Sequence, residues 1–196
     1  MTRLLALLTI AVALIATAQP SRAQVDDPDA RFGGAPTGKL FQFFSGGYAG
    51  STTRTTVNFA SNQKPGSIFI NTAERRLYFI LDNGQALRYG IGVGRDGFRW
   101  SGVHKVTAKK EWPSWTPPAQ MLRRRPDLPR HMKGGEDNPL GARAMYLGST
   151  LYRIHGSNEP ETIGQAVSSG CFRMTNADVI DLYNRVQVGA TVVVKN

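Results

Sequence analysis

The chain has 196 residues, of which 41% are hydrophobic, and its formal net charge is +10 at pH 7. This length suits a single domain with a sizeable core and a terminal extension. The positive charge favours anionic polymers such as cell wall or anionic lipid surfaces, with a basic surface that has no specific partner as the alternative. Because no zinc-finger spacing, basic helix or aromatic RNA-binding motif accompanies the charge, we expect no nucleic-acid partner.

The first 23 residues have the pattern of a secretory signal peptide. Arg3 precedes a largely apolar stretch over residues 4–18, and the small residues Ser21 and Ala23 fit a cleavage site. We expect cleavage after Ala23, or alternatively after Ala18, and export to the periplasm. The apolar stretch is short for a transmembrane helix, and we expect no membrane span in the mature chain.

Residues 24–65 are expected to form a flexible N-terminal extension, because Gly, Ser, Thr, Ala and Asn are frequent in them. Phe41, Phe43 and Phe44 are exceptions in this segment, and they are candidates for docking on the folded domain. The folded domain is expected to span residues 66–196, and we expect the protein to be a monomer.

The folded domain is expected to be mostly β. Its clearest element is a hairpin of residues 77–81 and 85–93, because the intervening Asn83-Gly84 tolerates the positive φ angles of a tight turn. A helix is expected over residues 177–186, with Asn176 as its N-cap. Further strands are expected over residues 67–71, 104–110, 142–147, 151–154 and 191–194.

Residues 112–141 contain repeated prolines, which fix φ and remove hydrogen-bond donors. A loop of this length in a compact domain is usually functional or disordered. Trp112 and Trp115 favour ordered packing, so we expect a lid or the wall of a groove. The basic run Arg123-Arg124-Arg125 is either a solvated face or a contact for carboxylates.

Cys171 is the only cysteine, and His155-Gly156 precedes it on a separate predicted strand. A lone thiol in an exported chain has no disulfide partner in that chain, which favours a reactive role. Two neighbouring strands can bring the His155 imidazole to the thiol, where the imidazole can take its proton. A nearby carbonyl can fix the tautomer of the imidazole, and the N–H groups of Gly170 and Cys171 can form an oxyanion hole.

Two alternatives assign Cys171 no catalytic role. A buried cysteine can act simply as a small apolar residue of the core. The thiol can also combine with His104, His131 and His155 as four zinc ligands, but their spacing is irregular and we expect no metal site.

The segment Ser168-Ser169-Gly170-Cys171-x-Arg173, together with His155-Gly156, resembles the signature of the L,D-transpeptidase catalytic domain of the YkuD type. The resemblance extends from about Pro65 to the C-terminus and includes Asn138-Pro139-Leu140-Gly141. It implies the family's mostly-β fold of sandwiched or mixed sheets with one or two short helices. Phe172 is a departure, because the family usually has a small aliphatic residue at this position.

The resemblance implies a role for each residue of the signature. Cys171 would be the nucleophile, His155 the general base and acid, and the Gly156 carbonyl the group that orients His155. The family acts on peptidoglycan stem peptides, releases D-alanine and passes the acyl group to a diaminopimelate amine, which gives a 3→3 cross-link. Some members attach an outer-membrane lipoprotein instead, others use water, and none needs a metal or organic cofactor.

Three further residues near the thiol have open roles. Arg173 can bind a substrate carboxylate or brace the cysteine loop. Ser168 and Ser169 can supply hydroxyl groups near the reacting centre, or can simply permit a tight loop. A hydrolase on the same fold and a non-catalytic wall-binding protein are the alternative functions.

Overall fold

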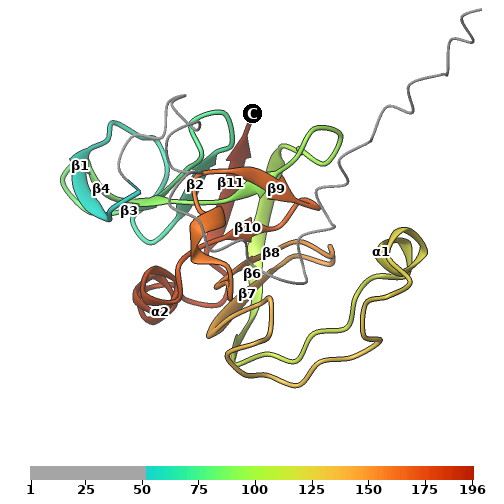
Figure 1. Ribbon diagram of the computed structural model, residues 1–196. Coiled ribbons are helices and arrows are strands. Elements are labelled where there is room, and N and C mark those ends of the chain that lie inside the picture. Colours follow the sequence, from blue (N-terminus) through green and yellow to red (C-terminus); the bar gives the residue numbers. More distant parts are fainter. Residues whose placement is uncertain (1–51) are drawn as a thin grey trace, which may run out of the picture.

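The computed structural model describes residues 52–196, which form the strands and helices shown in Figure 1. The expected signal peptide, residues 24–51 of the expected extension, and with them Phe41, Phe43 and Phe44, lie outside the described residues. Within residues 52–196, no helix is both long and apolar enough to cross a membrane. The strands are β1 (Thr55–Asn58), β2 (Ile68–Asn71), β3 (Arg76–Ile80), β4 (Gln85–Gly90), β5 (Val93–Gly94), β6 (Gly102–Glu111), β7 (Arg143–Leu147), β8 (Arg153–His155), β9 (Ala166–Ser168), β10 (Phe172–Arg173) and β11 (Thr191–Lys195), and the helices are α1 (Ala119–Arg124) and α2 (Asn176–Arg185).

Nine of these strands form one mixed sheet in the order β1-β4-β3-β2-β11-β6-β7-β8-β10, and β5 pairs with β9 in a second sheet. The mostly-β prediction is therefore confirmed. Strand β11, near the end of the chain, runs parallel to β2 and antiparallel to β6 (Figure 1). It thereby joins the hairpin half of the sheet to the half that contains β8 and β10.

The predicted hairpin is present as β3 and β4, which pair in antiparallel register. Asn83 and Gly84 in the connecting turn have φ angles of 60° and 70°. Both angles lie in the left-handed region that a tight turn of this kind requires. The local Asn-Gly signal is therefore sufficient to place this turn.

Strand β1 lies inside the segment that was expected to be a flexible extension, so that expectation is wrong for residues 55–58. It pairs with β4 along its whole length. Val57 and Phe59 pack on the outer face of the hairpin, where the Phe59 ring stacks on Tyr78 with ring centroids 4.5 Å apart. The β-branched residues of β1 suit a strand, but their hydroxyl groups made the segment look like a polar linker.

Helix α2 covers the sheet over β7 and helps to close the main core. Its Val179 and Leu182 are fully buried, and burying one such side chain contributes about 1.5–3 kcal/mol. The predicted helix is confirmed, but its N-cap is Thr175 rather than Asn176. The Thr175 side chain accepts a hydrogen bond of 3.1 Å from the Asp178 N–H.

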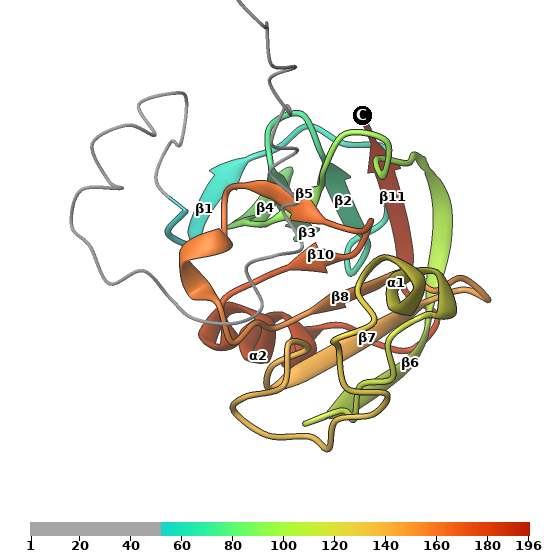
Figure 2. The same ribbon diagram turned by 45° about the vertical axis from the view of Figure 1, so that its right-hand side comes forward.

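The proline-rich segment forms an ordered arm between β6 and β7, with α1 at its far end (Figures 1 and 2). Trp115 and Met132 pair through two backbone hydrogen bonds of 2.8 Å, which close the arm on itself. Trp115, Leu128 and Leu140 form a small apolar core of their own within the arm. The prediction of ordered packing is therefore confirmed.

Candidate active site

The pairing of β8 with β10 determines which side chains meet at the site. The two strands run parallel, with Phe172 opposite Ile154 and Arg173 opposite His155. Phe172 and Ile154 are buried in the core. Because side chains alternate along a strand, His155 and Arg173 project to the other face.

Cys171, which directly precedes β10, lies on that same face. It shares a cleft of about 440 Å³ with His155. The proline-rich arm supplies one wall of this cleft, and the segment before β8 supplies another. The lining residues are Phe98, Trp115, Pro118, Gln120, Met121, Arg124, Pro139, Leu140, Thr150, Leu151, Tyr152, Arg153, His155, Ser168, Ser169, Cys171 and Arg173.

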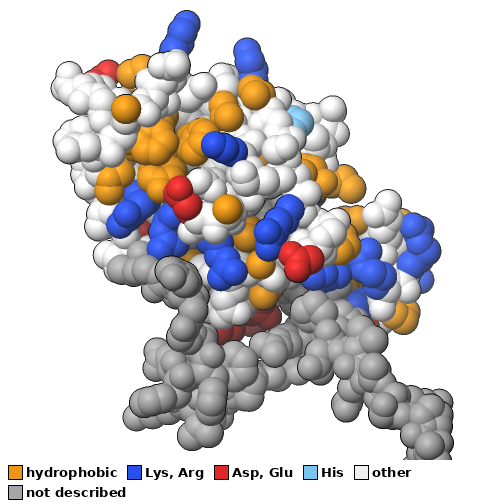
Figure 3. All heavy atoms as spheres, turned by 90° about the horizontal axis from the view of Figure 1, so that it is seen from above, with side chains coloured by type: hydrophobic (Ala, Val, Ile, Leu, Met, Phe, Trp, Pro, Cys, Tyr) orange, Lys and Arg blue, Asp and Glu red, His pale blue; other side chains and the backbone are white. Residues whose placement is uncertain are grey.

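The arm also brings positive charge to the rim of the cleft. Figure 3 shows Lys and Arg side chains gathered at the α1 end of the molecule. Arg123 and Arg124 lie in the last turn of α1, and the Arg124 guanidinium lies over the Phe98 ring, 5.2 Å from its centroid. The cleft therefore combines apolar walls with cationic groups, which suits a ligand that carries carboxylates.

His155 is held in a defined tautomer. It is 4% exposed, and its Nδ1 lies 2.6 Å from the Gly156 carbonyl oxygen. A carbonyl oxygen only accepts hydrogen bonds, so Nδ1 carries the proton and Nε2 is left as the basic nitrogen. Burial, reinforced by the Arg173 charge, lowers the pKa of His155 to about 3, although the Gly156 carbonyl opposes this shift.

The Cys171 thiol is held in its protonated form. Burial raises its pKa, against the opposing charge and hydrogen bonding of Arg153. The Sγ atom lies 3.7 Å from the Leu151 carbonyl oxygen, which can accept the S–H. With the pKa of His155 lowered and that of Cys171 raised, the resting pair is a neutral imidazole and a neutral thiol.

Asn176 positions the carbonyl that orients His155. Its Oδ1 accepts hydrogen bonds from the N–H groups of Ala142, at 2.9 Å, and Ser157, at 3.3 Å. A Cβ on Gly156 or Gly141 would collide with this oxygen. Glycine at both positions therefore lets two loops and the start of α2 meet directly behind the imidazole.

Ser168 braces the loop that carries the thiol. Its hydroxyl donates to the Cys171 carbonyl at 2.6 Å and accepts from the Gly170 N–H at 3.1 Å. The Gly170 N–H is therefore occupied, contrary to the expectation of a free oxyanion donor. Ser169 lines the cleft, and its buried Oγ has no hydrogen-bond partner within the described part of the chain.

An aromatic stack supports the same loop from behind. Trp100 and Tyr152 stack with centroids 4.4 Å apart, and the Trp100 indole N–H donates to the Gly170 carbonyl at 2.8 Å. Phe172 lies against Trp100 and is 1% exposed. The large side chain that departs from the family pattern therefore fills the core beneath the loop, away from the thiol.

Arg173 is engaged within the protein. Its guanidinium forms an ion pair of 3.1 Å with Glu159, and its backbone pairs with Gly92 through two hydrogen bonds of 2.9 Å. Of the two roles expected for Arg173, these contacts favour bracing.

Of the three histidines considered as zinc ligands, His155 shares the cleft with Cys171, but His104 and His131 do not line it. His104 packs edge-on against Trp100, and His131 faces the Thr116 hydroxyl at 3.1 Å. In the described part of the chain, no group of three or more His, Cys, Asp or Glu side chains is arranged to hold a metal ion.

Sequence reasoning missed four residues of this site. It assigned no role to Arg153, and it assigned Asn176 to a helix cap. Glu159 and Leu151 have no signal of their own, because their roles depend on contacts with Arg173 and Cys171 across the fold.

A buried imidazole fixed by a carbonyl, in one cleft with a thiol, is the arrangement of enzymes that use a cysteine nucleophile. The model of the L,D-transpeptidase catalytic domain, YkuD, matches residues 65–194, and the chain belongs to this family. The resemblance seen in the sequence is thereby confirmed.

Several known proteins are similar to this chain over the domain. The probable L,D-transpeptidase ErfK/SrfK of Escherichia coli is 39% identical over 134 residues, which cover 64% of this chain and 42% of that protein. The chain thus spans less than half of that relative. A Brucella melitensis structure described as a probable carnitine operon oxidoreductase is 44% identical, with a TM-score of 0.51, and covers 74% of this chain and 95% of its own. L,D-transpeptidase 3 of Mycobacterium tuberculosis shares the fold at 15% identity and a TM-score of 0.55, covering 66% of this chain and 60% of its own.

Proposed function

We propose that this protein is an exported L,D-transpeptidase that modifies peptidoglycan through a thioester on Cys171. The observation that carries this assignment is the His155 Nδ1–H bound to the Gly156 carbonyl in the cleft that contains the thiol. This bond leaves Nε2 free to take a proton, which is what a thiol needs in order to become a nucleophile.

The first half of the reaction forms the thioester. His155 takes the proton of Cys171, and the thiolate attacks the carbonyl that follows the L-centre of diaminopimelate in a tetrapeptide stem. The carbon–nitrogen bond to the terminal D-alanine breaks. The imidazolium then gives its proton to the departing amine, and the acyl group stays on sulfur.

The second half transfers the acyl group. The side-chain amine of a second stem, or an amine of an outer-membrane lipoprotein, attacks the thioester while neutral His155 accepts its proton. Sulfur leaves as the thiolate and is protonated again. This chemistry requires no metal or organic cofactor, and the basic rim at α1 suits the anionic stem peptides.

The signal-peptide pattern over residues 1–23 supports export to the periplasm, which is where the proposed substrate would lie. We propose that the protein acts there as a monomer, after cleavage at Ala23 or Ala18.

Incubation of the mature protein with a disaccharide-tetrapeptide tests the function, with products identified by mass. We expect a 3→3 dimer together with free D-alanine. A shortened monomer alone would instead indicate the hydrolase, and an unchanged substrate would favour the wall-binding alternative.

Substitutions test which residues carry out the proposed chemistry. Cys171→Ala should form no product, and His155→Ala should lose most of the rate. His131→Ala is the matched control, because this histidine is exposed and lies outside the cleft. Dimer formation by Cys171→Ala would disprove the thioester.

A further inference from the structure

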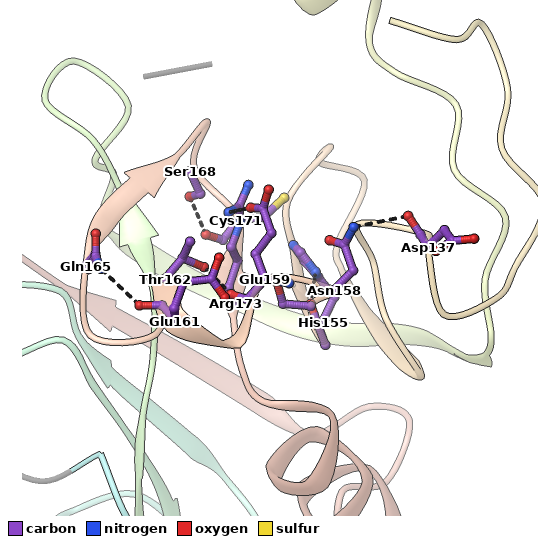
Figure 4. Close-up of polar contacts among 12 residues, drawn as sticks. Asp137, His155, Asn158, Glu159, Glu161, Thr162, Gln165, Ser168, Cys171 and Arg173 are labelled. Atoms are coloured by element: carbon purple, nitrogen blue, oxygen red, sulfur yellow. Dashed lines mark hydrogen bonds and ion pairs between the residues drawn. The ribbon is translucent and has the colours of Figure 1, made fainter. Parts of the chain in front are cut away.

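A buried ion pair lies directly beside His155. Arg173 and Glu159 are joined at 3.1 Å, and their side chains are only 10% and 20% exposed. Arg173 is the strand neighbour of His155 in the β8–β10 pairing. Figure 4 shows Glu159, Arg173, His155 and Cys171 in one group, with Glu159 reaching in from the loop that follows β8.

We propose that Glu159 is a positioning residue that offsets the charge of Arg173, so that His155 can take and hold the proton of Cys171. Glu159 does not line the cleft, so it acts through Arg173 rather than by touching substrate. Its role serves the Cys171–His155 pair and therefore rests on the function proposed above.

The loop geometry holds Glu159 in place for this role. Its backbone N–H donates to the Ser157 hydroxyl at 2.9 Å, and its carbonyl accepts from the Thr162 hydroxyl at 2.7 Å. The short 3₁₀ turn over Pro160–Thr162 follows directly. Burial raises the pKa of Glu159, but the guanidinium of Arg173 opposes this shift and favours the charged carboxylate.

The charges around His155 explain why an offset is needed. Arg153 on its own strand and Arg173 on β10 both disfavour an imidazolium, while the Gly156 carbonyl favours it. The Cys171 thiol lines the same cleft as His155. With Arg153 and Arg173 both cationic, the carboxylate of Glu159 is the anionic group that compensates one of them.

Removing the carboxylate has two opposite effects. In Glu159→Gln, Arg173 keeps its charge but loses its ion pair with Glu159. That charge stabilises the Cys171 thiolate, because Arg173 already lowers the pKa of this thiol. The same charge destabilises the His155 imidazolium, which must form to protonate the leaving amine.

The experiment measures both effects on the mature full-length protein. Alkylation of Cys171 by iodoacetamide, followed against pH without substrate, reports the thiol. In Glu159→Gln we expect its apparent pKa to fall by roughly 0.5–1 unit, which speeds alkylation at neutral pH. Turnover of the disaccharide-tetrapeptide should fall about tenfold.

Two variants control for structural damage. Glu161→Gln removes an exposed carboxylate two positions away, and should change neither measurement. Glu159→Gln combined with Arg173→Met removes both charges, and should return alkylation to the wild-type rate or below it.

Loss of alkylation together with turnover would indicate a collapsed loop and overturn the proposal, as would an unchanged rate in both assays. Equally fast alkylation in the double variant would exclude Arg173 as the intermediary. Because alkylation needs no peptidoglycan, failure of the proposed function would appear separately, as a wild-type protein that alkylates normally but makes no product.

Discussion

Asn176 links three segments behind the His155 imidazole, and Asn176→Ala should weaken both folding and the proposed activity. The substitution leaves the N–H groups of Ala142 and Ser157 without their acceptor in a partly buried location. An unsatisfied buried donor costs about 1–3 kcal/mol. The two donors together cost about 2–6 kcal/mol, and alanine recovers roughly 0.5 kcal/mol of helix propensity at this first helical position, so we expect a net loss of about 1.5–5.5 kcal/mol.

Urea denaturation measures this loss, and Asn184→Ala provides the control. Asn184 lies in the same helix and is exposed, so its replacement should be neutral or slightly stabilising. Turnover by Asn176→Ala should fall further than its stability alone explains, because the Gly156–Ser157 peptide unit, which carries the carbonyl that orients His155, loses its hydrogen bond to Asn176. A loss below 1 kcal/mol with unchanged turnover would refute this account of Asn176.

Three other changes have defined outcomes. Gly170→Ala should destabilise the protein by about 1–3 kcal/mol in urea denaturation and slow alkylation of the thiol, because the φ angle of Gly170 is 107° and the new Cβ would meet the Tyr152 ring. Wild-type stability of this variant would contradict the prediction. Arg153→Met should raise the apparent pKa of the Cys171 thiol in an iodoacetamide pH profile, because Arg153 stabilises the thiolate. The control Arg123→Met replaces an exposed arginine and should leave this pKa unchanged. The same shift in both variants would refute a local effect of Arg153. The neutral, buried His155 should lower the free energy of unfolding as pH falls from about 6.5 toward 3, because only the unfolded chain then binds a proton at this imidazole. Between pH 7 and 4.5, wild type should therefore lose roughly 2–3 kcal/mol more stability than His155→Gln. Equal losses of stability would argue against the lowered pKa of His155.

Local chemistry explains which elements could be predicted from the sequence. The Asn83-Gly84 turn is determined by two adjacent residues that tolerate positive φ, and the structure contains it where expected. Cys171 and His155 stood out because their side chains are rare in this chain and chemically specific. The same reasoning did not predict strand β1, because its threonines are compatible with both a strand and a polar linker until the partner strand is known.

The contacts that tune the site were beyond sequence reasoning because they join distant positions. Asn176 reaches the Ala142 N–H across 34 positions, and Glu159 reaches Arg173 across 14. An asparagine before a helix predicts a cap equally well, and a surface loop commonly carries a glutamate. Only the tertiary arrangement assigns these two side chains to the carbonyl of Gly156 and to the charge beside His155.

The charges at this site act differently on the resting thiol and on the thiolate that reacts. At rest, burial keeps Cys171 protonated and His155 neutral, so little thiolate is present. The thiolate is the form that oxidants attack, and a neutral resting pair therefore protects a lone cysteine in the oxidising surroundings expected for an exported protein. Reactivity in the proposed mechanism then depends on moving one proton from Cys171 to His155. Arg153 and Arg173 favour the resulting thiolate, and the Gly156 carbonyl and the Glu159 carboxylate favour the imidazolium. In the proposed mechanism the site gains its nucleophile only when His155 takes the proton of Cys171, and the imidazolium then passes that proton to the leaving amine.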